Sequence, residues 1–303
     1  MTLSSWVHHL GGRVEYHENE TYTTRTVCAG AGDEPPLVLL HGIGGHAETY
    51  VRNVVPIAEV LGDREVHSID FIGHGYSSRP ADLDYHIADY VEQVLEFIDG
   101  LGHDTAHIYG ESLGGWVAGR IGLDHPEAVE TVGLITTSGV YHIDTSGAVE
   151  EGVKEESLSG IEDLYERSMQ MLDEGLDHDL VANRLQWLFV EDVDEELVNI
   201  RYEIYSQPAN QAAMRNIYRT FVEDVKDPDV YFTTDELREL DVPTLVLHTE
   251  HNPSAKKELA AYVHEQLPDS EYLLYEHSGH WPQWEEVDRF NEDIVDYLRR
   301  NEP

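Results

Sequence analysis

The chain has 303 residues, 41% of them hydrophobic, which is enough for one sizeable α/β core with an insertion. It carries 60 Asp and Glu against 19 Lys and Arg, and a formal net charge of −41 disfavours nucleic acid and anionic membranes as partners. The longest apolar runs, such as Leu37–Leu40, are too short to cross a bilayer, and the single cysteine, Cys28, excludes an intramolecular disulfide.

Short segments rich in β-forming or apolar residues predict the strands. The first two, Arg13–Glu18 and Tyr22–Cys28, are flanked by turn residues and predict an antiparallel pair. The later segments are short apolar runs bounded by turn signals, which is typical of parallel strands buried on both faces. These segments are Leu37–Leu40, Val66–Ile69, Ala106–Tyr109, Thr131–Thr136, Thr244–His248 and Glu271–Tyr275.

Amphipathic helices are expected between the strands. Apolar residues recur at helical spacing from Ile87 to Ile98 and again from Val287 to Leu298, with acidic residues on the opposite side. Alternating strands and helices predict an α/β fold with a doubly wound, mostly parallel sheet. From about 144 to 222 the sequence is helical and acidic without a clear strand, so we expect a core of residues 1–143 and 223–303 with a helical lid at 144–222, inserted after the sixth strand.

The strongest chemical signal is Gly110-Glu111-Ser112-Leu113-Gly114-Gly115, directly after a predicted strand and before a helix-compatible run. This is the G-x-S-x-G nucleophile elbow, in which the serine sits in a sharp turn and the glycines allow neighbouring backbones to crowd close. We therefore expect Ser112 to be a nucleophile. A Gly-rich turn without a catalytic role would match the motif alone, but not its strand-turn-helix context.

A second glycine-rich segment, His41-Gly42-Ile43-Gly44-Gly45, follows the strand Leu37–Leu40. Its glycines let the chain fold back over the elbow, so that the backbone N–H of Ile43 and that of Leu113 can stabilise an oxyanion. The alternative is a turn that merely requires glycine.

The general base must be an imidazole late in the chain, because the order of such a triad is Ser, acid, His. His280 lies after the last predicted strand, and His277 is its only local rival. No histidines pair with a carboxylate at a convincing metal-binding spacing, so we expect no metal and no cofactor.

Together with Asp70-Phe71-Ile72-Gly73-His74-Gly75, these motifs resemble the α/β-hydrolase superfamily over nearly the whole chain. Within it, Gly279-His280-Trp281-Pro282-Gln283-Trp284-Glu285 and the segment 195–202 are similar to the meta-cleavage product hydrolases, which split carbon–carbon bonds in ring-fission products of aromatic compounds. The resemblance implies that Arg201 binds a substrate carboxylate through its bidentate fork and that Trp281 contacts substrate. The alternative for Arg201 is an ion pair on a helix surface.

The sequence departs from that family at two positions. Glu111 stands where the subfamily usually has Asn, and a carboxylate there disfavours a nearby dienolate. The position of the catalytic Asp is occupied by Asn252, in Thr249-Glu250-His251-Asn252-Pro253. An amide can orient His280 without neutralising an imidazolium, and Glu250 could supply the acid instead, so both stay open.

Three functions follow from these residues. The first is a serine hydrolase that forms an acyl-enzyme with a carboxylic ester or related small acyl substrate, and the second is a carbon–carbon bond hydrolase of a meta-cleavage-type dienoate. The third is a ligand receptor on a hydrolase scaffold, suggested by the missing Asp. All three have a small molecule as partner, and the sequence does not specify an oligomeric state.

The acidic excess is spread along the chain and resembles that of proteins from salt-accumulating halophiles, because repulsion of this size needs screening. An acidic protein from a low-salt organism is the alternative. The segment Met1–Gly12 has no signal-peptide pattern, so we expect a cytoplasmic protein.

Overall fold

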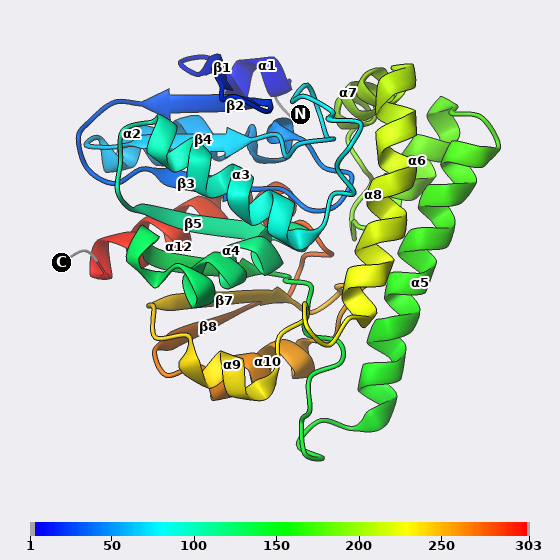
Figure 1. Cartoon of the computed structure of the whole chain (residues 1–303). Coiled ribbons are helices and arrows are strands. Elements are labelled where there is room, and N and C mark those ends of the chain that lie inside the picture. Colours follow the sequence, from blue (N-terminus) through cyan, green and yellow to red (C-terminus); the bar gives the residue numbers. More distant parts are fainter. Residues whose placement is uncertain (1–3, 302–303) are drawn as a thin grey trace.

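The computed structural model describes residues 4–301 (Figure 1). Within them, eight strands form one sheet in the order β1-β2-β4-β3-β5-β6-β7-β8. The first strand pairs antiparallel with β2, and β2 pairs antiparallel with β4, whereas all later pairs are parallel. The strands are β1 (Arg13–Glu18), β2 (Thr23–Gly30), β3 (Leu37–Leu40), β4 (Glu65–Ile69), β5 (Ala106–Glu111), β6 (Val129–Ile135), β7 (Thr244–Thr249) and β8 (Ser270–Tyr275). The predicted mostly parallel sheet is confirmed.

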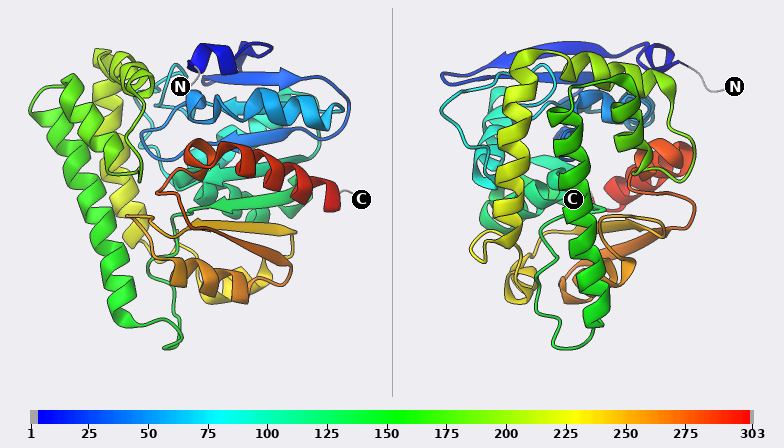
Figure 2. Two further views of the ribbon diagram at one scale, coloured as in Figure 1. Left: turned by 180° about the vertical axis from the view of Figure 1, so that it is seen from behind. Right: turned by 90° about the vertical axis from the view of Figure 1, so that its right-hand side faces the viewer.

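Helices cover both faces of the sheet, because the central strands bury every side chain and need an apolar layer on each side. On one face lie α2 (Val54–Leu61) and α12 (Val287–Arg300), which share an apolar cluster with β3, and both are seen in the rear view of Figure 2. The other face is covered by α3 (Ile87–Gly100), α4 (Leu113–Asp124) and α10 (Lys257–Gln266). Short elements complete the core: α1 (Ser5–His8), η1 (Ala47–Tyr50), η2 (Pro126–Ala128), α9 (Thr234–Glu239) and α11 (Pro282–Glu285).

The amphipathic pattern of α3 shows how the sequence selects these helices. Its apolar positions from Ile87 to Ile98 are buried, except that Val91 and Leu95 are partly buried, while Glu92 and Glu96 are exposed. The Asp89 carboxylate accepts a hydrogen bond from the N–H of His86 (2.8 Å), which satisfies a backbone donor at the start of the helix. The helix predicted at this position is thereby confirmed.

A helical insertion between β6 and β7 stands at the carboxyl ends of the parallel strands, on the right of Figure 1. It consists of α5 (Glu151–Asp173), α6 (His178–Gln186), α7 (Glu195–Tyr205) and α8 (Pro208–Lys226), so it runs past the predicted limit at residue 222. In α5, a Cβ at Gly160 would lie 2.3 Å from the carbonyl oxygen of Pro253, so glycine lets this helix touch the loop after β7. The outer limits of the predicted core, residues 1 and 303, lie outside the described part of the chain.

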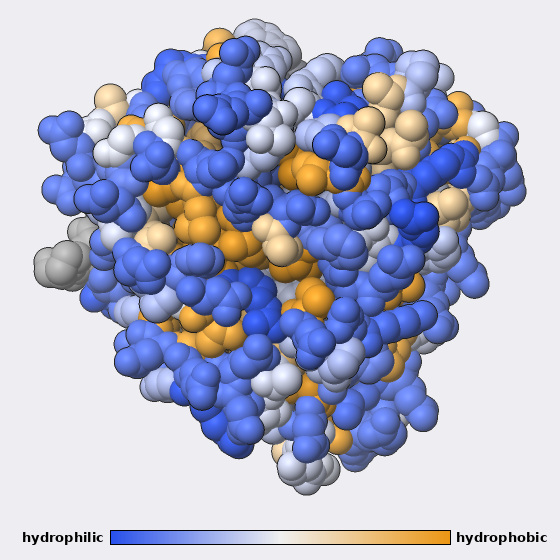
Figure 3. Space-filling view, viewed as in Figure 1, coloured by the Kyte–Doolittle hydropathy of each residue, from blue (hydrophilic) through white to orange (hydrophobic). Residues whose placement is uncertain are grey.

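The surface in Figure 3 is mostly hydrophilic, with apolar groups showing in hollows between the helices. This agrees with the large acidic excess of the sequence. Across residues 4–301, the helices are all too short or too polar to span a bilayer.

Candidate active site

Ser112 occupies the sharp turn between β5 and α4. Its backbone has φ 55° and ψ −112°, in a region that L-residues rarely adopt. A Cβ at Gly110 would lie 2.0 Å from the carbonyl carbon of Gly114, so only glycine permits the tight approach of the two backbones. The Ser112 carbonyl accepts hydrogen bonds from the N–H groups of Trp116 and Ser138, both at 3.1 Å, which hold the strained turn. The structure therefore shows the sharp strand-turn-helix geometry that the motif predicts.

The hydroxyl of Ser112 belongs to a short chain of hydroxyl groups. Its Oγ lies 3.1 Å from the Oγ of Ser138, which in turn lies 3.0 Å from the hydroxyl of Tyr141. Burial raises the pKa of Tyr141 to about 12, so its hydroxyl keeps its proton at neutral pH. No sequence motif marks Ser138 or Tyr141, which lie in the loop after β6.

His280 is buried in the loop after β8, and its two ring nitrogens have different partners. Its Nδ1 lies 2.8 Å from Oδ1 of Asn252, and its Nε2 lies 2.8 Å from Oε1 of Glu111. Among the described residues no hydrogen bond joins His280 to the Oγ of Ser112. The rival histidine, His277, is exposed on the same loop and takes no part in this cluster.

The orientation of the Asn252 amide follows from its hydrogen bonds. The backbone N–H of Ser254 donates to Oδ1 (3.1 Å), so this atom must be the amide oxygen and can only accept a proton from His280. Nδ1 of His280 therefore carries hydrogen. Asn252 thus contacts the imidazole at Nδ1 through its amide oxygen.

The structure does not bring Glu250 to His280. Its carboxylate binds the ammonium of Lys257, with N–O distances of 2.5 and 2.6 Å, at the surface. Of the two alternatives left open by the sequence, Asn252 contacts the imidazole and Glu250 does not. The physical reason is that Lys257 opens α10 beside the loop and pairs with the outward-facing carboxylate.

Glu111 contributes the carboxylate nearest to His280, although the sequence marked it only as a departure. Its side chain is buried, and its Oε2 accepts a hydrogen bond from the N–H of Gly42 (2.8 Å). A Cβ at position 42 would lie 2.6 Å from this oxygen, so the glycine makes room for the carboxylate. The glycine-rich loop after β3 thus also holds Glu111.

The two backbone N–H groups expected to form an oxyanion hole lie at the ends of β3 and β5. A Cβ at Gly114 would lie 2.2 Å from the carbonyl oxygen of Leu40, which places the first turn of α4 directly against the end of β3. Within residues 4–301, no hydrogen bond occupies the N–H of Ile43 or that of Leu113. Both donors are therefore without a partner in this part of the chain.

Arg201 of α7 is buried against the same glycine-rich loop. Its Nη1 donates to the carbonyl of Gly44, while Nε and Nη2 are buried and have no hydrogen-bond partner among the described residues. Its guanidinium carbon lies 5.6 Å from the ring centroid of Trp281 and 5.5 Å from that of Tyr205. No carboxylate of the described residues pairs with it, so the surface ion pair considered from the sequence is not what the structure shows.

The histidines around Arg201 do not add to its charge. Burial lowers the pKa of His41 and His46, and it lowers the pKa of His74 to about 3. These three rings are therefore neutral at pH 7. In a buried region with neutral neighbours, an unpaired guanidinium attracts an anion strongly, because the local dielectric is low.

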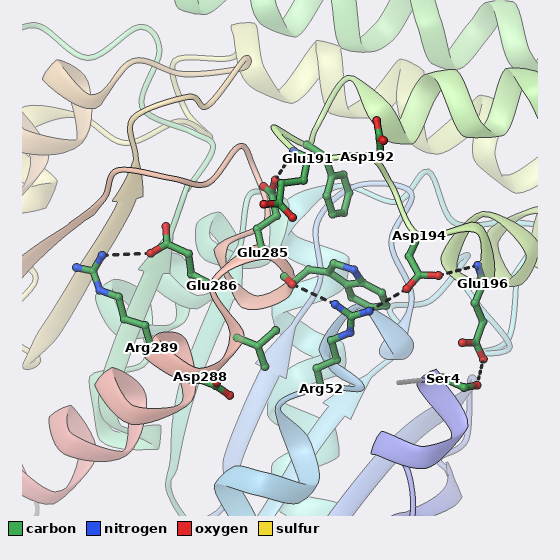
Figure 4. A pocket seen from close by; sticks show the side chains of 13 residues that line it. Ser4, Arg52, Glu191, Asp192, Asp194, Glu196, Glu285, Glu286, Asp288 and Arg289 are labelled. Carbon is green, nitrogen blue, oxygen red and sulfur yellow. Dashed lines mark hydrogen bonds and ion pairs between the residues drawn. The ribbon is translucent and has the colours of Figure 1, made fainter. Parts of the chain in front are cut away.

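A separate open groove of about 850 Å³ lies outside this cluster, between the loop that precedes α7 and the start of α12 (Figure 4). Its two arginines are already paired, Arg52 with Asp194 (3.0 Å) and Arg289 with Glu286 (3.4 Å). Further carboxylates line its wall, so the groove repels anions. In the described residues, no group of three or more His, Cys, Asp or Glu side chains is placed to hold a metal ion.

Comparison with known proteins agrees with this geometry. Residues 35–287 match the family described as alpha/beta hydrolase fold. A 2-hydroxymuconate semialdehyde hydrolase of Pseudomonas putida is 26% identical over 277 residues, covering 90% of each chain. Lipase 3 of a Moraxella species is 22% identical over 292 residues, covering 95% of this chain and 80% of the lipase.

Among solved structures, a meta-cleavage product hydrolase from Pseudomonas fluorescens superposes with a TM-score of 0.76 at 21% identity, covering 95% of this chain and 98% of the other. The chain belongs to the α/β-hydrolase fold family. Within that family it is similar to meta-cleavage product hydrolases, as its motifs indicated.

Proposed function

We propose that this protein hydrolyses a small acyl substrate that bears a carboxylate, with carbon–carbon bond cleavage of a meta-cleavage-type dienoate as the leading reaction. The observation that carries the proposal is Arg201, a buried guanidinium with two unpartnered donors beside Trp281. A planar guanidinium matches the two oxygens of a carboxylate. The name of the 2-hydroxymuconate semialdehyde hydrolase supports the same substrate class.

In the proposed mechanism, Ser112 is the nucleophile and His280 the general base. The Oγ of Ser112 adds to the substrate carbonyl carbon, its proton passes to Nε2 of His280, and the carbonyl electron pair moves onto oxygen. The N–H groups of Ile43 and Leu113 bind that oxyanion. When the carbonyl re-forms, the bond to the leaving carbon breaks, and that carbon takes the proton from Nε2.

The second half of the cycle removes the acyl group. Water adds to the acyl-enzyme carbonyl while His280 accepts its proton, and the proton then returns to the Oγ of Ser112 as the carboxylic acid leaves. Asn252 holds Nδ1–H throughout, because its Oδ1 is a fixed acceptor. The helices α5 to α8 act as a lid, since α7 brings Arg201 over the carboxyl ends of the strands.

A carboxylic-ester hydrolase is the second candidate, and Glu111 favours it. Its buried carboxylate lies at the residue before the nucleophile, where negative charge opposes the formation of a dienolate. Ester hydrolysis uses the same serine, base and oxyanion donors but forms no carbanion. The similarity to a lipase is consistent with this candidate.

The test compares a ring-fission dienoate with the methyl ester of its carboxylate, and both with a short p-nitrophenyl ester, in high salt. We expect kcat/KM for the free acid to exceed that for its methyl ester by about 10- to 100-fold, because a hydrogen-bonded charge pair is worth ~1.5–3 kcal/mol. Turnover of the p-nitrophenyl ester alone would select the ester hydrolase. No turnover and no reaction of Ser112 with a fluorophosphonate would indicate the receptor instead.

A further inference from the structure

The two departures from the family pattern, Glu111 and Asn252, meet at one imidazole. Glu111 contacts Nε2 of His280 and Asn252 contacts Nδ1, each at 2.8 Å. The site has therefore not simply lost a carboxylate. A carboxylate is missing on the Nδ1 side of the ring, and one is present on the Nε2 side.

Nε2 of His280 and Oε1 of Glu111 form a buried ion-pair contact at 2.8 Å, and the proton that this contact needs can be placed by its chemistry. Nδ1 already carries hydrogen because Asn252 presents its amide oxygen. At 2.8 Å an Nε2 lone pair and a carboxylate oxygen repel each other, so the contact is favourable only when a proton is present on the ring nitrogen or on the carboxyl group. In either case the Glu111–His280 pair holds one proton besides the one on Nδ1.

Among the described residues, the carboxyl group of Glu111 has no cationic partner other than His280. Its side chain is 1% exposed, and among residues 4–301 its ion pair is with His280, without a Lys or Arg at ion-pair distance. The second carboxylate oxygen is fixed by the N–H of Gly42. The imidazole of His280 is therefore the group whose charge the Glu111 carboxylate can balance.

We propose that Glu111 is a positioning residue that supplies the negative charge absent from Asn252, acting on His280 from its Nε2 side. The proposal rests on the proposed roles of Ser112 and His280. When the shared proton passes to solvent water, the Glu111 carboxylate and the Nε2 lone pair repel each other, and Nε2 turns to the hydroxyl of Ser112. The imidazolium that forms after proton transfer is then neutralised by the adjacent carboxylate of Glu111.

The test is a double-mutant cycle that removes the negative charge on the Nε2 side of the His280 imidazole and places one on the Nδ1 side. Glu111→Gln keeps an acceptor for Gly42 but removes the charge, and we expect kcat to fall at least ~30-fold with KM changed less than about threefold. Asn252→Asp restores a carboxylate on the Nδ1 side. We expect the double variant, Glu111→Gln with Asn252→Asp, to recover to within about threefold of the wild-type kcat.

Two results would overturn the inference: an unchanged kcat in Glu111→Gln, or a double variant as slow as Glu111→Gln alone. Glu286→Gln is the matched control, because its carboxylate binds Ser278 on the same loop without touching the imidazole. We expect its kcat to stay within about twofold of wild type. If circular dichroism shows that Glu111→Gln does not fold, the same double-mutant cycle is carried out with Glu111→Asn.

Fluorophosphonate labelling separates this inference from the proposed function. If Ser112→Ala still turns over substrate and is still labelled, the proposed function fails. If Ser112→Ala is inactive while Glu111→Gln remains fully active, the proposed function stands and the role of Glu111 is wrong.

Discussion

Oδ1 of Asn252 lies 2.8 Å from Nδ1 of His280, in the position where the family has a carboxylate. Asn252→Ala removes this acceptor and leaves Nδ1 with only the longer contact to Oγ of Ser254, at 3.3 Å. We expect kcat to fall more than tenfold, equivalent to about 1.4 kcal/mol of barrier, because the ring loses its fixed tautomer. Steady-state kinetics on the best substrate measures the loss.

Glu250→Gln serves as the comparison for Asn252→Ala. Its carboxylate pairs with Lys257 at the surface, so we expect kcat within about twofold of wild type. The reverse ranking, with Glu250→Gln far slower than Asn252→Ala, would assign the acid to Glu250 and contradict the geometry.

Arg201 is expected to select substrates by their carboxylate. Arg201→Ala should lower kcat/KM for a carboxylate-bearing substrate about 10- to 100-fold and leave a neutral ester nearly unchanged, because only the anion uses the unpartnered donors. Arg201→Lys should give an intermediate loss, since an ammonium cannot form the bidentate pair.

Arg215→Ala is the control for these variants, because Arg215 lies in the same insertion but already pairs with Asp173. We expect it to leave both substrates unaffected. Equal losses on the acid and the neutral ester in Arg201→Ala would make Arg201 a packing residue.

The excess of acidic residues predicts that salt stabilises the fold. With 60 Asp and Glu against 19 Lys and Arg, repulsion destabilises the compact state, and added ions shorten its range from ~10 Å at 0.1 M to ~3 Å at 1 M. We expect Tm to rise steadily between roughly 0.1 M and 1 M KCl. Calorimetry at constant pH measures this, and a Tm independent of KCl would argue against the halophilic interpretation.

Buried histidines predict acid sensitivity. Burial lowers the pKa of His74 and His107 to about 3 and that of His248 to about 4. The unfolded chain binds protons at these residues near pH 6.5, whereas the folded chain does not until far lower pH. Their contribution to stability is therefore complete above about pH 6.5 and is lost as pH falls toward about 4.

Urea denaturation between about pH 7.5 and 4.5 in fixed salt measures this dependence. The unfolding free energy should decrease with falling pH, by at most about 1.4 kcal/mol per pH unit for each proton. His107→Gln, which lies far from Ser112 at the start of β5, should lessen the slope. An identical slope in that variant would show that His107 is not held neutral by the fold.

Local sequence signals determined the sheet, the nucleophile elbow and the late histidine. Gly110 specifies the turn around Ser112 because a Cβ there would meet the backbone of Gly114, and that constraint acts between near neighbours in the chain. The strands and the amphipathic helices α3 and α12 were likewise readable, since their burial patterns repeat within a few residues.

Tertiary structure alone decided which polar side chains meet. Glu111 and Asn252 are 141 positions apart in the sequence, and nothing local indicates that both touch His280. The choice between Asn252 and Glu250 depended on which one faces inward, and that is set by Lys257 and Ser254 around the loop. Hydrogen bonds between distant segments require the folded backbone to bring donor and acceptor within about 3 Å, so their pairing is a property of the fold and not of any motif.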